Sequence, residues 1–312
     1  MVSGSNCLKS YYYFIYLCGI NVFPKDEEPG MLAKCIYIIS NALLKSLTVL
    51  FILVLFTSVF IFSPDFLENT YDLFSRGIPL LYMINLTCFY VTYCQANINK
   101  DLMQFLYTYF KSVDLPVQFE NSLHSQAKFF WILYFVDVFP KVCIIFPAIL
   151  YFSFGENINY FLCNLCFLIP VVYALVVHAY MNVYISILLP YNAILIHLCS
   201  ELHLKVEAFG SAMQVHGNFH TTLEKYTEIR KVISVINSTF SKVLLALSIY
   251  LLFSISFIFF AFQLIIPESD GALQIIYIVL ILLPFGGCLE TFLYFNLALI
   301  STSKLTRMVS SY

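Results

Sequence analysis

The sequence predicts an all-α fold, a polytopic membrane helix bundle, on the strength of three observations. The 312 residues are 61% hydrophobic and only 11% charged, whereas a soluble domain is about 25% charged. Apolar runs recur along the chain at about the length that a helix needs to cross a bilayer. Basic residues gather beside alternate ends of these runs. Because short loops join the runs, we expect a single transmembrane helical domain over residues 1–312.

Six runs are long and apolar enough to be membrane spans, and each is bounded by charged or turn residues. The runs lack the alternation of polar and apolar residues that a membrane barrel requires. An earlier apolar stretch, Tyr11–Phe23, is too short to span and is expected to be an interfacial helix. The predicted spans cover residues 36–62, 78–96, 129–154, 160–189, 243–266 and 272–300.

The basic residues predict the orientation of the chain, because lysines and arginines beside spans stay cytoplasmic. All but two of the 16 basic residues lie before or at the start of span one, in the loops after spans two and four, or after span six. The loops on the other side are short and acidic. The amino and carboxyl termini are therefore expected in the cytoplasm. A seven-span G-protein-coupled receptor, with its amino terminus outside, would place these basic residues on the wrong side.

Residues 190–242, between spans four and five, are predicted to be a pair of long cytoplasmic helical extensions. Apolar residues recur there at the spacing of one helix face, first before the stretch GSAMQVHGN and again after it. Two interpretations stay open: a hairpin that packs only on its own chain, or a surface that also holds subunits together. The two apolar faces comprise Leu195, Leu198, Leu202, Val206 and Phe209, then Tyr226, Ile229, Ile233, Ile236 and Phe240.

Charged residues inside the predicted spans are candidates for function, because such charges are costly in lipid. Asp137 and Lys141 are four residues apart in span three, with Pro140 between them. They form either a self-neutralised pair on one helix face or a site of ligand contact or gating. Glu290 in span six either couples to gating or pairs with basic residues of the cytoplasmic helices.

A pocket for an uncharged ligand is expected in the outer half of the bundle, among aromatic and amide side chains. The sequence predicts no metal site and no cofactor, since His216 and His220 are expected in a glycine-containing loop without partners, and Cys163 and Cys166 have no second cysteine pair. It also lacks a nucleophile or carboxylate pair with catalytic spacing, so we expect no enzyme. The candidate pocket residues are Tyr82, Asn85, Phe146, Tyr151, Asn164, Tyr173 and Gln263.

Two stretches carry a family resemblance. The first is FIYLCGINVFP, residues 14–24, with its Gly-x-x-x-Phe-Pro ending before span one. The second is LEKYTEIRKVISVINSTFSKVLLALSIYLLFSISFIFFAF, residues 223–262, which leads from the cytoplasmic helix into span five. Together with the inside amino terminus and the short loop FGENINY, they resemble the insect gustatory receptor family, of the seven-transmembrane chemosensory receptor group.

The resemblance implies a subunit of a ligand-gated cation channel in the plasma membrane of sensory neurons, which detects small tastants such as sugars or bitter compounds. It implies assembly into a homo- or heterotetramer with related receptor subunits. The family's seventh span lines the pore and carries a Thr-Tyr-x-x-x-x-x-Gln-Phe motif, which this sequence lacks. The expectation is therefore a chain that stops before its pore helix and that conducts no tastant-gated current when expressed alone.

A small multi-spanning secondary transporter is the alternative from another functional class. Six spans with an intramembrane Asp and Lys suit a proton-coupled cycle. Against this alternative, residues 36–154 and 160–300 show no evident internal repeat, and the long cytoplasmic helices have no clear role in transport. Uptake of substrate into vesicles that contain the purified chain would separate the two hypotheses.

Overall fold

Helices account for nearly all of the described residues in the computed structural model of the chain. The predicted all-α fold needs one small correction within that part: two short strands pair antiparallel, with Val2 opposite Leu115 and Ser3 opposite Asp114. This pair fastens the amino terminus to the segment that follows α4. The structure describes residues 2–3, 5–24, 27, 29–60, 70–128, 131–132, 135–136, 139, 173, 177–178, 180–210, 216–264 and 271–310.

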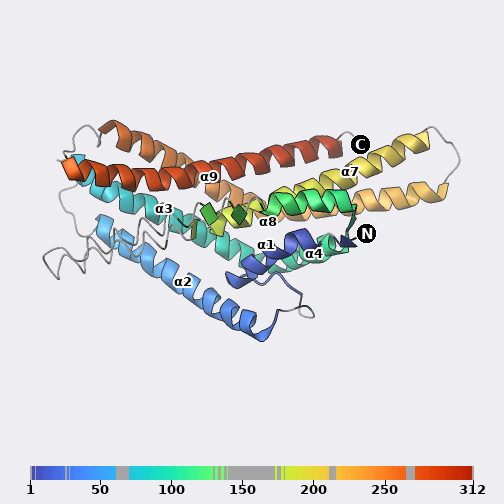
Figure 1. Ribbon diagram of the computed structural model, residues 1–312, viewed down its shortest axis with the longest axis horizontal. Helices are drawn as coiled ribbons and strands as arrows, with labels where there is room; N and C mark the ends of the chain where they lie inside the picture. The colour runs from blue at the N-terminus through green and yellow to red at the C-terminus, as the bar shows by residue number, and fades with distance from the viewer. Residues whose placement is uncertain are drawn as a thin grey trace.

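Most of the elements labelled in Figure 1 are long helices. Residues 117–128 and 180–186 are helical as well. In chain order, the elements are β1 (Val2–Ser3), α1 (Ser5–Leu17), α2 (Met31–Phe60), α3 (Thr70–Ile98), α4 (Lys100–Ser112), β2 (Asp114–Leu115), α7 (Leu188–Gly210), α8 (His216–Leu264) and α9 (Gly271–Ser310).

Three helices of the described part are long and apolar enough to cross a membrane: Met31–Thr57, Tyr180–Lys205 and His220–Phe260. They overlap the predicted spans one, four and five. Helices α3 and α9 cover the predicted spans two and six. Most of span three and most of span four lie outside the described residues, so the number of six spans and their orientation stay predictions.

Helix α1 ends at a glycine that no other residue could replace without strain. The Ile20 amide donates to the Ile15 carbonyl and the Gly19 amide to the Tyr16 carbonyl, which closes the helix in the manner of a Schellman motif. Gly19 has a φ of 88°, a left-handed conformation that side chains disfavour. A Cβ there would also lie 2.7 Å from the backbone of Asn41. Gly19 therefore lets α1 turn and lets α2 approach closely.

The rest of the Gly-x-x-x-Phe-Pro stretch is held by α3 and α4. The Tyr93 hydroxyl donates to the Gly19 carbonyl at 3.0 Å, and the Gln104 amide donates to the Phe23 carbonyl at 2.8 Å. The buried Phe23 ring lies 5.1 Å from the ring of Tyr107, edge to face. The motif thus has a structural explanation, because its glycine and phenylalanine fasten the amino-terminal segment to the bundle.

Glu27, a few residues further on, anchors the same segment to α4. Its carboxylate accepts hydrogen bonds from the Lys111 ammonium and, at 3.0 Å, from the Tyr107 hydroxyl. The bond from Lys111 is the main reason why the pKa of Glu27 falls below its ordinary value of 4.5. Burial raises the pKa of Tyr107 to about 12, and the hydrogen bond to Glu27 and then the charge of Glu27 add to this rise.

Helices α7 and α8 form a long hairpin that extends beyond the rest of the bundle, at the end where both chain termini lie (Figure 1). The predicted pairing of these two helices is confirmed. On α7, Leu195 and Leu202 are buried, and on α8 so are Ile229, Ile236 and Phe240. The apolar faces that the sequence predicts are therefore the faces along which the hairpin packs.

The helix that leads into α7 is interrupted at Ile187, within the last three residues of predicted span four. Residues 180–186 are helical, Ile187 is a turn residue, and α7 begins at Leu188. Pro190 has no N–H to donate to the carbonyl of Ser186, so the regular hydrogen-bond pattern cannot continue across this point. The span therefore continues into its extension with a joint at Ile187, where the helix is locally interrupted.

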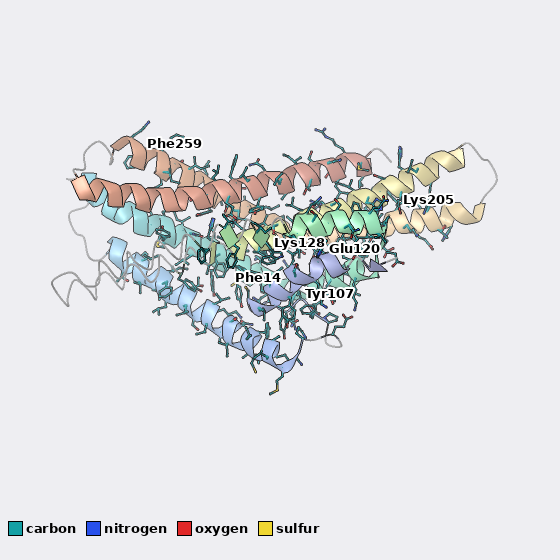
Figure 2. The ribbon with its side chains drawn as sticks, in the orientation of Figure 1. Phe14, Tyr107, Glu120, Lys128, Lys205 and Phe259 are labelled. Atoms are coloured by element: carbon teal, nitrogen blue, oxygen red, sulfur yellow. The ribbon has the colours of Figure 1, made fainter. Side chains whose placement is uncertain are left out.

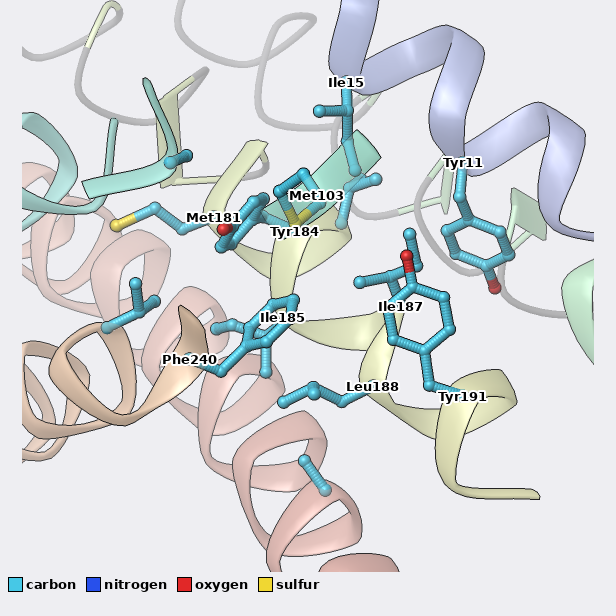
Figure 3. Packing of buried hydrophobic residues seen from close by; sticks show 14 of the residues in the cluster. Tyr11, Ile15, Met103, Met181, Tyr184, Ile185, Ile187, Leu188, Tyr191 and Phe240 are labelled. Carbon is cyan, nitrogen blue, oxygen red and sulfur yellow. The ribbon is translucent and has the colours of Figure 1, made fainter. Parts of the chain in front are cut away.

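The core lies where α1, α4, α7 and α8 meet, as Figure 3 shows. Aromatic rings fill its centre: Tyr191 of α7 stacks on Phe110 of α4 with ring centroids 4.4 Å apart. The Tyr191 hydroxyl donates to the Tyr12 hydroxyl of α1 at 2.8 Å. Buried tyrosines usually find such partners. The short helix α1 was expected at a membrane interface. The face of α1 that carries Tyr12 packs into the protein core.

Candidate functional site: a buried polar cluster

A cluster of polar side chains lies inside the bundle, where residues 177–178 and 180–186 pack against α9. His178, Asn182 and Thr291 are each at most 1% exposed. The His178 Nε2 atom lies 2.9 Å from the Gly287 carbonyl oxygen and 2.8 Å from the Thr291 hydroxyl. The Thr291 hydroxyl donates to Asn182 Oδ1 at 2.7 Å. These bonds join two segments that are more than 100 residues apart in the chain.

The hydrogen-bond pattern assigns the proton on the His178 ring. A carbonyl oxygen only accepts, so Nε2 must carry a hydrogen to bond with Gly287. The single hydroxyl proton of Thr291 is used toward Asn182, so Thr291 accepts from His178. The N–H at Nε2 of His178 is therefore shared between the Gly287 carbonyl and the Thr291 hydroxyl. Each hydrogen bond of the cluster then has one donor and one acceptor.

Two further helices complete the cluster with aromatic and sulfur groups. The Tyr250 hydroxyl of α8 lies 3.6 Å from the Cys288 sulfur of α9. The Tyr250 ring lies 5.6 Å from the His178 ring, centroid to centroid. Tyr82 of α3 is close enough to Cys288 to interact with it electrostatically. The cluster therefore connects α3, residues 177–178 and 180–186, α8 and α9.

Hydrogen-bonding capacity remains inside this cluster. The Asn182 amide nitrogen and the Tyr82 hydroxyl have no hydrogen-bond partner among the described residues, although both side chains are almost fully buried. Buried polar groups without partners cost free energy, about 1–3 kcal/mol each. Such groups suit a small uncharged molecule that accepts hydrogen bonds and is enclosed between the helices.

Four of the seven predicted pocket residues lie in the described part of the structure, and they do not all lie in one place. Tyr82 belongs to the cluster, and Asn85 is buried three residues further along α3. The Tyr173 hydroxyl instead contacts α2, 2.8 Å from the Thr48 hydroxyl and 3.1 Å from the Leu44 carbonyl. The Gln263 side chain is exposed on α8. The remaining three, Phe146, Tyr151 and Asn164, lie outside the described residues.

The predicted intramembrane charges are placed only in part. Glu290 is half-buried on α9, next in sequence to Thr291 of the cluster. Helix α9 runs unbroken through the Pro284–Gly287 region that precedes it. Asp137 and Lys141 lie outside the described residues, so their pairing stays a prediction.

Sequence reasoning missed His178, Asn182 and Thr291, although a signal for two of them was present. His178 and Asn182 are polar residues four apart inside an apolar run, which places them on one face of a helix. An ionisable side chain in such a run is a functional candidate by default. Thr291 carries no comparable signal, because a threonine in an apolar helix often bonds its own backbone.

The histidines near the hairpin correct one expectation. His216 begins α8 and His220 lies within it, so these residues are helical rather than in a loop. His220 Nδ1 is 3.2 Å from a Glu224 carboxylate oxygen, one turn further along the helix. Within the described residues, no group of three or more His, Cys, Asp or Glu side chains could hold a metal ion. Cys163 and Cys166 lie outside that part.

Comparison of the chain with protein-family models, curated proteins and solved structures finds no significant match. The resemblance to gustatory receptors therefore stays a prediction that rests on the sequence patterns.

Proposed function

We propose that the chain is a chemosensory receptor subunit of the gustatory type that binds a small uncharged tastant inside its helix bundle. The observation that carries the proposal is the α7–α8 hairpin, which extends beyond the other helices at the end shared by both termini. A transport cycle has no use for such an extension. A receptor that assembles from subunits has one, because the hairpin offers additional surface to neighbouring chains.

The buried polar cluster is the ligand site in this proposal. Its amide and hydroxyl groups can orient a molecule that carries hydroxyl or carbonyl groups, and its aromatic rings supply apolar contacts. The joint at Ile187 directly follows helical residues 180–186, which include Asn182, and His178 is helical as well. A ligand that shifts this helix would therefore act on α7 and the hairpin through the joint.

The finer features of the proposal rest on the sequence. Six spans with both termini in the cytoplasm agree with the distribution of basic residues. Assembly with related subunits, cation conduction and a place in the plasma membrane of sensory neurons follow from the family resemblance alone.

Ligand-dependent stabilisation of the purified chain tests the proposal. Sucrose and caffeine represent sugars and bitter compounds, and at least one of the two is expected to raise the thermal unfolding temperature saturably. Asn182→Leu should abolish this rise, because it removes a buried amide of the cluster. Asn296→Leu is the matched control, since Asn296 donates only to the Phe292 carbonyl of its own helix. Equal responses of both variants, or no response of the unaltered chain, would count against the proposal.

A proton-coupled transporter is a second candidate, and one observation favours it. His178 is an ionisable group enclosed in the bundle and hydrogen-bonded to a hydroxyl, which is an arrangement suited to proton relay. Uptake of solutes into vesicles that contain the purified chain, driven by a pH gradient, would establish this function if His178→Gln abolished it. Stabilisation by a tastant without any uptake favours the receptor.

A further inference from the structure

A second site lies away from the polar cluster, at the base of the α7–α8 hairpin. There the carboxyl end of α4 leans against both hairpin helices and encloses a cavity of about 310 Å³. Leu202 and Ile229 are buried in its floor, and the partly buried Tyr109 forms one wall. This volume is at the lower limit of ligand-binding pockets, which range from about 300 to 1,000 Å³. The cavity therefore fits a small molecule and is too small for a folded partner.

The rim of the cavity carries two lysines and three carboxylates: Lys205, Lys225, Glu201, Glu228 and, on β2, Asp114. The four charges on the hairpin are ordered along it. Lys205 on α7 follows Glu201 by four residues, or about 6 Å along the helix axis. Helix α8 runs in the opposite direction, so Lys225 lies nearer the hairpin turn than Glu228 does. Both lysines consequently lie toward the hairpin turn, and both glutamates toward the bundle. Figure 2 shows Lys205 on the protruding part of α7.

Most of these rim charges have no counterion among the residues that the structure describes. Lys205, Lys225 and Glu228 form no ion pair in the described part of the structure, whereas Glu201 lies 3.5 Å from His197. Glu201 and Lys205 have the i, i+4 spacing at which such a pair forms most readily on a helix, yet they do not pair. The negative charge of Glu228 acts on the cavity wall, because burial and then this charge raise the pKa of Tyr109.

We propose that this cavity binds a small zwitterion of amino-acid size. Its carboxylate would lie between Lys205 and Lys225, and its ammonium group at Glu201 and Glu228. Its apolar side chain would lie on Leu202 and Ile229. A simple anion would leave the glutamates without a counterion, and a simple cation would leave the lysines without one. The ligand would connect α4 with both helices of the hairpin, so its binding would stabilise their contact.

Thermal unfolding of the full chain in detergent tests this proposal with three probes: L-leucine, L-methionine and L-phenylalanine. At least one should raise the unfolding temperature saturably. For an effective amino acid such as L-leucine, the matched analogues leucinol and isocaproate carry only the ammonium or only the carboxylate. Each should be at least tenfold less potent. No effect from any of the three amino acids, or equal potency of a singly charged analogue, overturns the proposal.

Charge-removing variants locate the binding. Lys225→Gln and Glu228→Gln should each weaken the apparent affinity at least tenfold. Lys304→Gln and Glu224→Gln, which change exposed residues outside the cavity, should leave it unchanged. The unfolding temperature of each variant without ligand shows whether it folds. Equal losses in the controls would overturn the assignment to this cavity. The tastant experiment on Asn182 tests the buried polar cluster and not this cavity, so the two proposals can fail separately.

Discussion

The two halves of α8 share one continuous helix but expose opposite kinds of residue. In residues 220–242 most exposed positions carry polar or charged side chains, such as Glu228 and Arg230. In residues 243–260 most of them carry apolar side chains, with Leu252 exposed at 70% and Phe259 at 66%. Both halves nevertheless bury apolar residues on the side that faces the protein. Figure 2 places Phe259 at the end of the molecule opposite the hairpin.

The exposed residues of a helix therefore indicate its environment, and the buried residues do not. Buried residues such as Ile229 and Leu247 look alike in both halves, because protein interiors are packed in the same way whatever surrounds them. Such a difference is expected of a helix that passes from water into lipid, because water favours charges and lipid tails favour apolar groups. The change falls just after Lys242, where the sequence predicts that span five begins.

Truncating the ring of Phe240, at the junction of the two halves, should have the largest effect. Phe240 is 1% exposed, and its ring lies 5.1 Å from that of Tyr184. Phe240→Ala should lower the free energy of unfolding by about 3–5 kcal/mol, the cost of a cavity of this size. Unfolding in detergent followed by circular dichroism measures it. Phe259→Ala is the matched control, expected near the unaltered chain, and a similar loss in both would refute the burial of Phe240.

A charge on the exposed side should separate the two halves directly. We expect Leu252→Lys to reduce membrane insertion, because a lysine at the centre of a spanning helix costs about 2.5–3.5 kcal/mol. Leu223→Lys introduces the same charge at an exposed leucine of the charged half and should insert normally. The fraction of chain that resists alkaline extraction from membranes gives the readout. Equal insertion of the two variants would mean that this half of α8 does not lie in lipid.

Removing one hydroxyl of the polar cluster should have a smaller effect. Thr291→Val leaves Asn182 Oδ1 without its donor, and an unsatisfied buried group costs about 1–3 kcal/mol. Thr306→Val is the matched control, because the Thr306 hydroxyl is exposed and bonds only the Thr302 carbonyl of its own helix. Unfolding midpoints in detergent should fall for the first variant alone. An unchanged midpoint for Thr291→Val would show that this hydrogen bond does not stabilise the cluster.

The hairpin could be predicted from the sequence, whereas the polar cluster could not. The hairpin faces repeat every three to four residues, so a local pattern records which side of each helix is buried. The cluster forms from residues more than 100 positions apart, His178 and Thr291, and no local pattern records that contact. Depth along a span predicted Tyr82 and Asn85 as inward residues. It failed to separate them from Gln263, because depth does not specify which face of a helix points inward.

The Ile187 joint and the Gly19 turn show the same limit. Pro190 and Gly19 are visible in the sequence as residues that disturb or end a helix. Their consequences depend on neighbours: Gly19 matters because Asn41 lies against it. The sequence therefore indicates where the backbone is unusual. The packing of α2 explains why position 19 requires a glycine.

The smallest expected effect concerns pH at the charged end of the molecule. The pKa of Glu27 is lowered in the folded chain, mainly by the hydrogen bond from Lys111. A lowered carboxyl pKa contributes stability above the ordinary value of 4.5, and this contribution is lost as pH falls below that value through the folded pKa. Because Glu27 and Lys111 are both partly exposed, solvent screening limits the contribution to less than about 1 kcal/mol.

Glu27→Gln should therefore lower stability slightly at pH 7 and make the loss of stability between pH 5 and pH 3 less steep, as measured by unfolding in detergent. Asp101→Asn, a change of another exposed carboxylate on α4, serves as the control. A steeper acid loss in Glu27→Gln than in the unaltered chain would show that this carboxylate does not fasten the amino-terminal segment to α4.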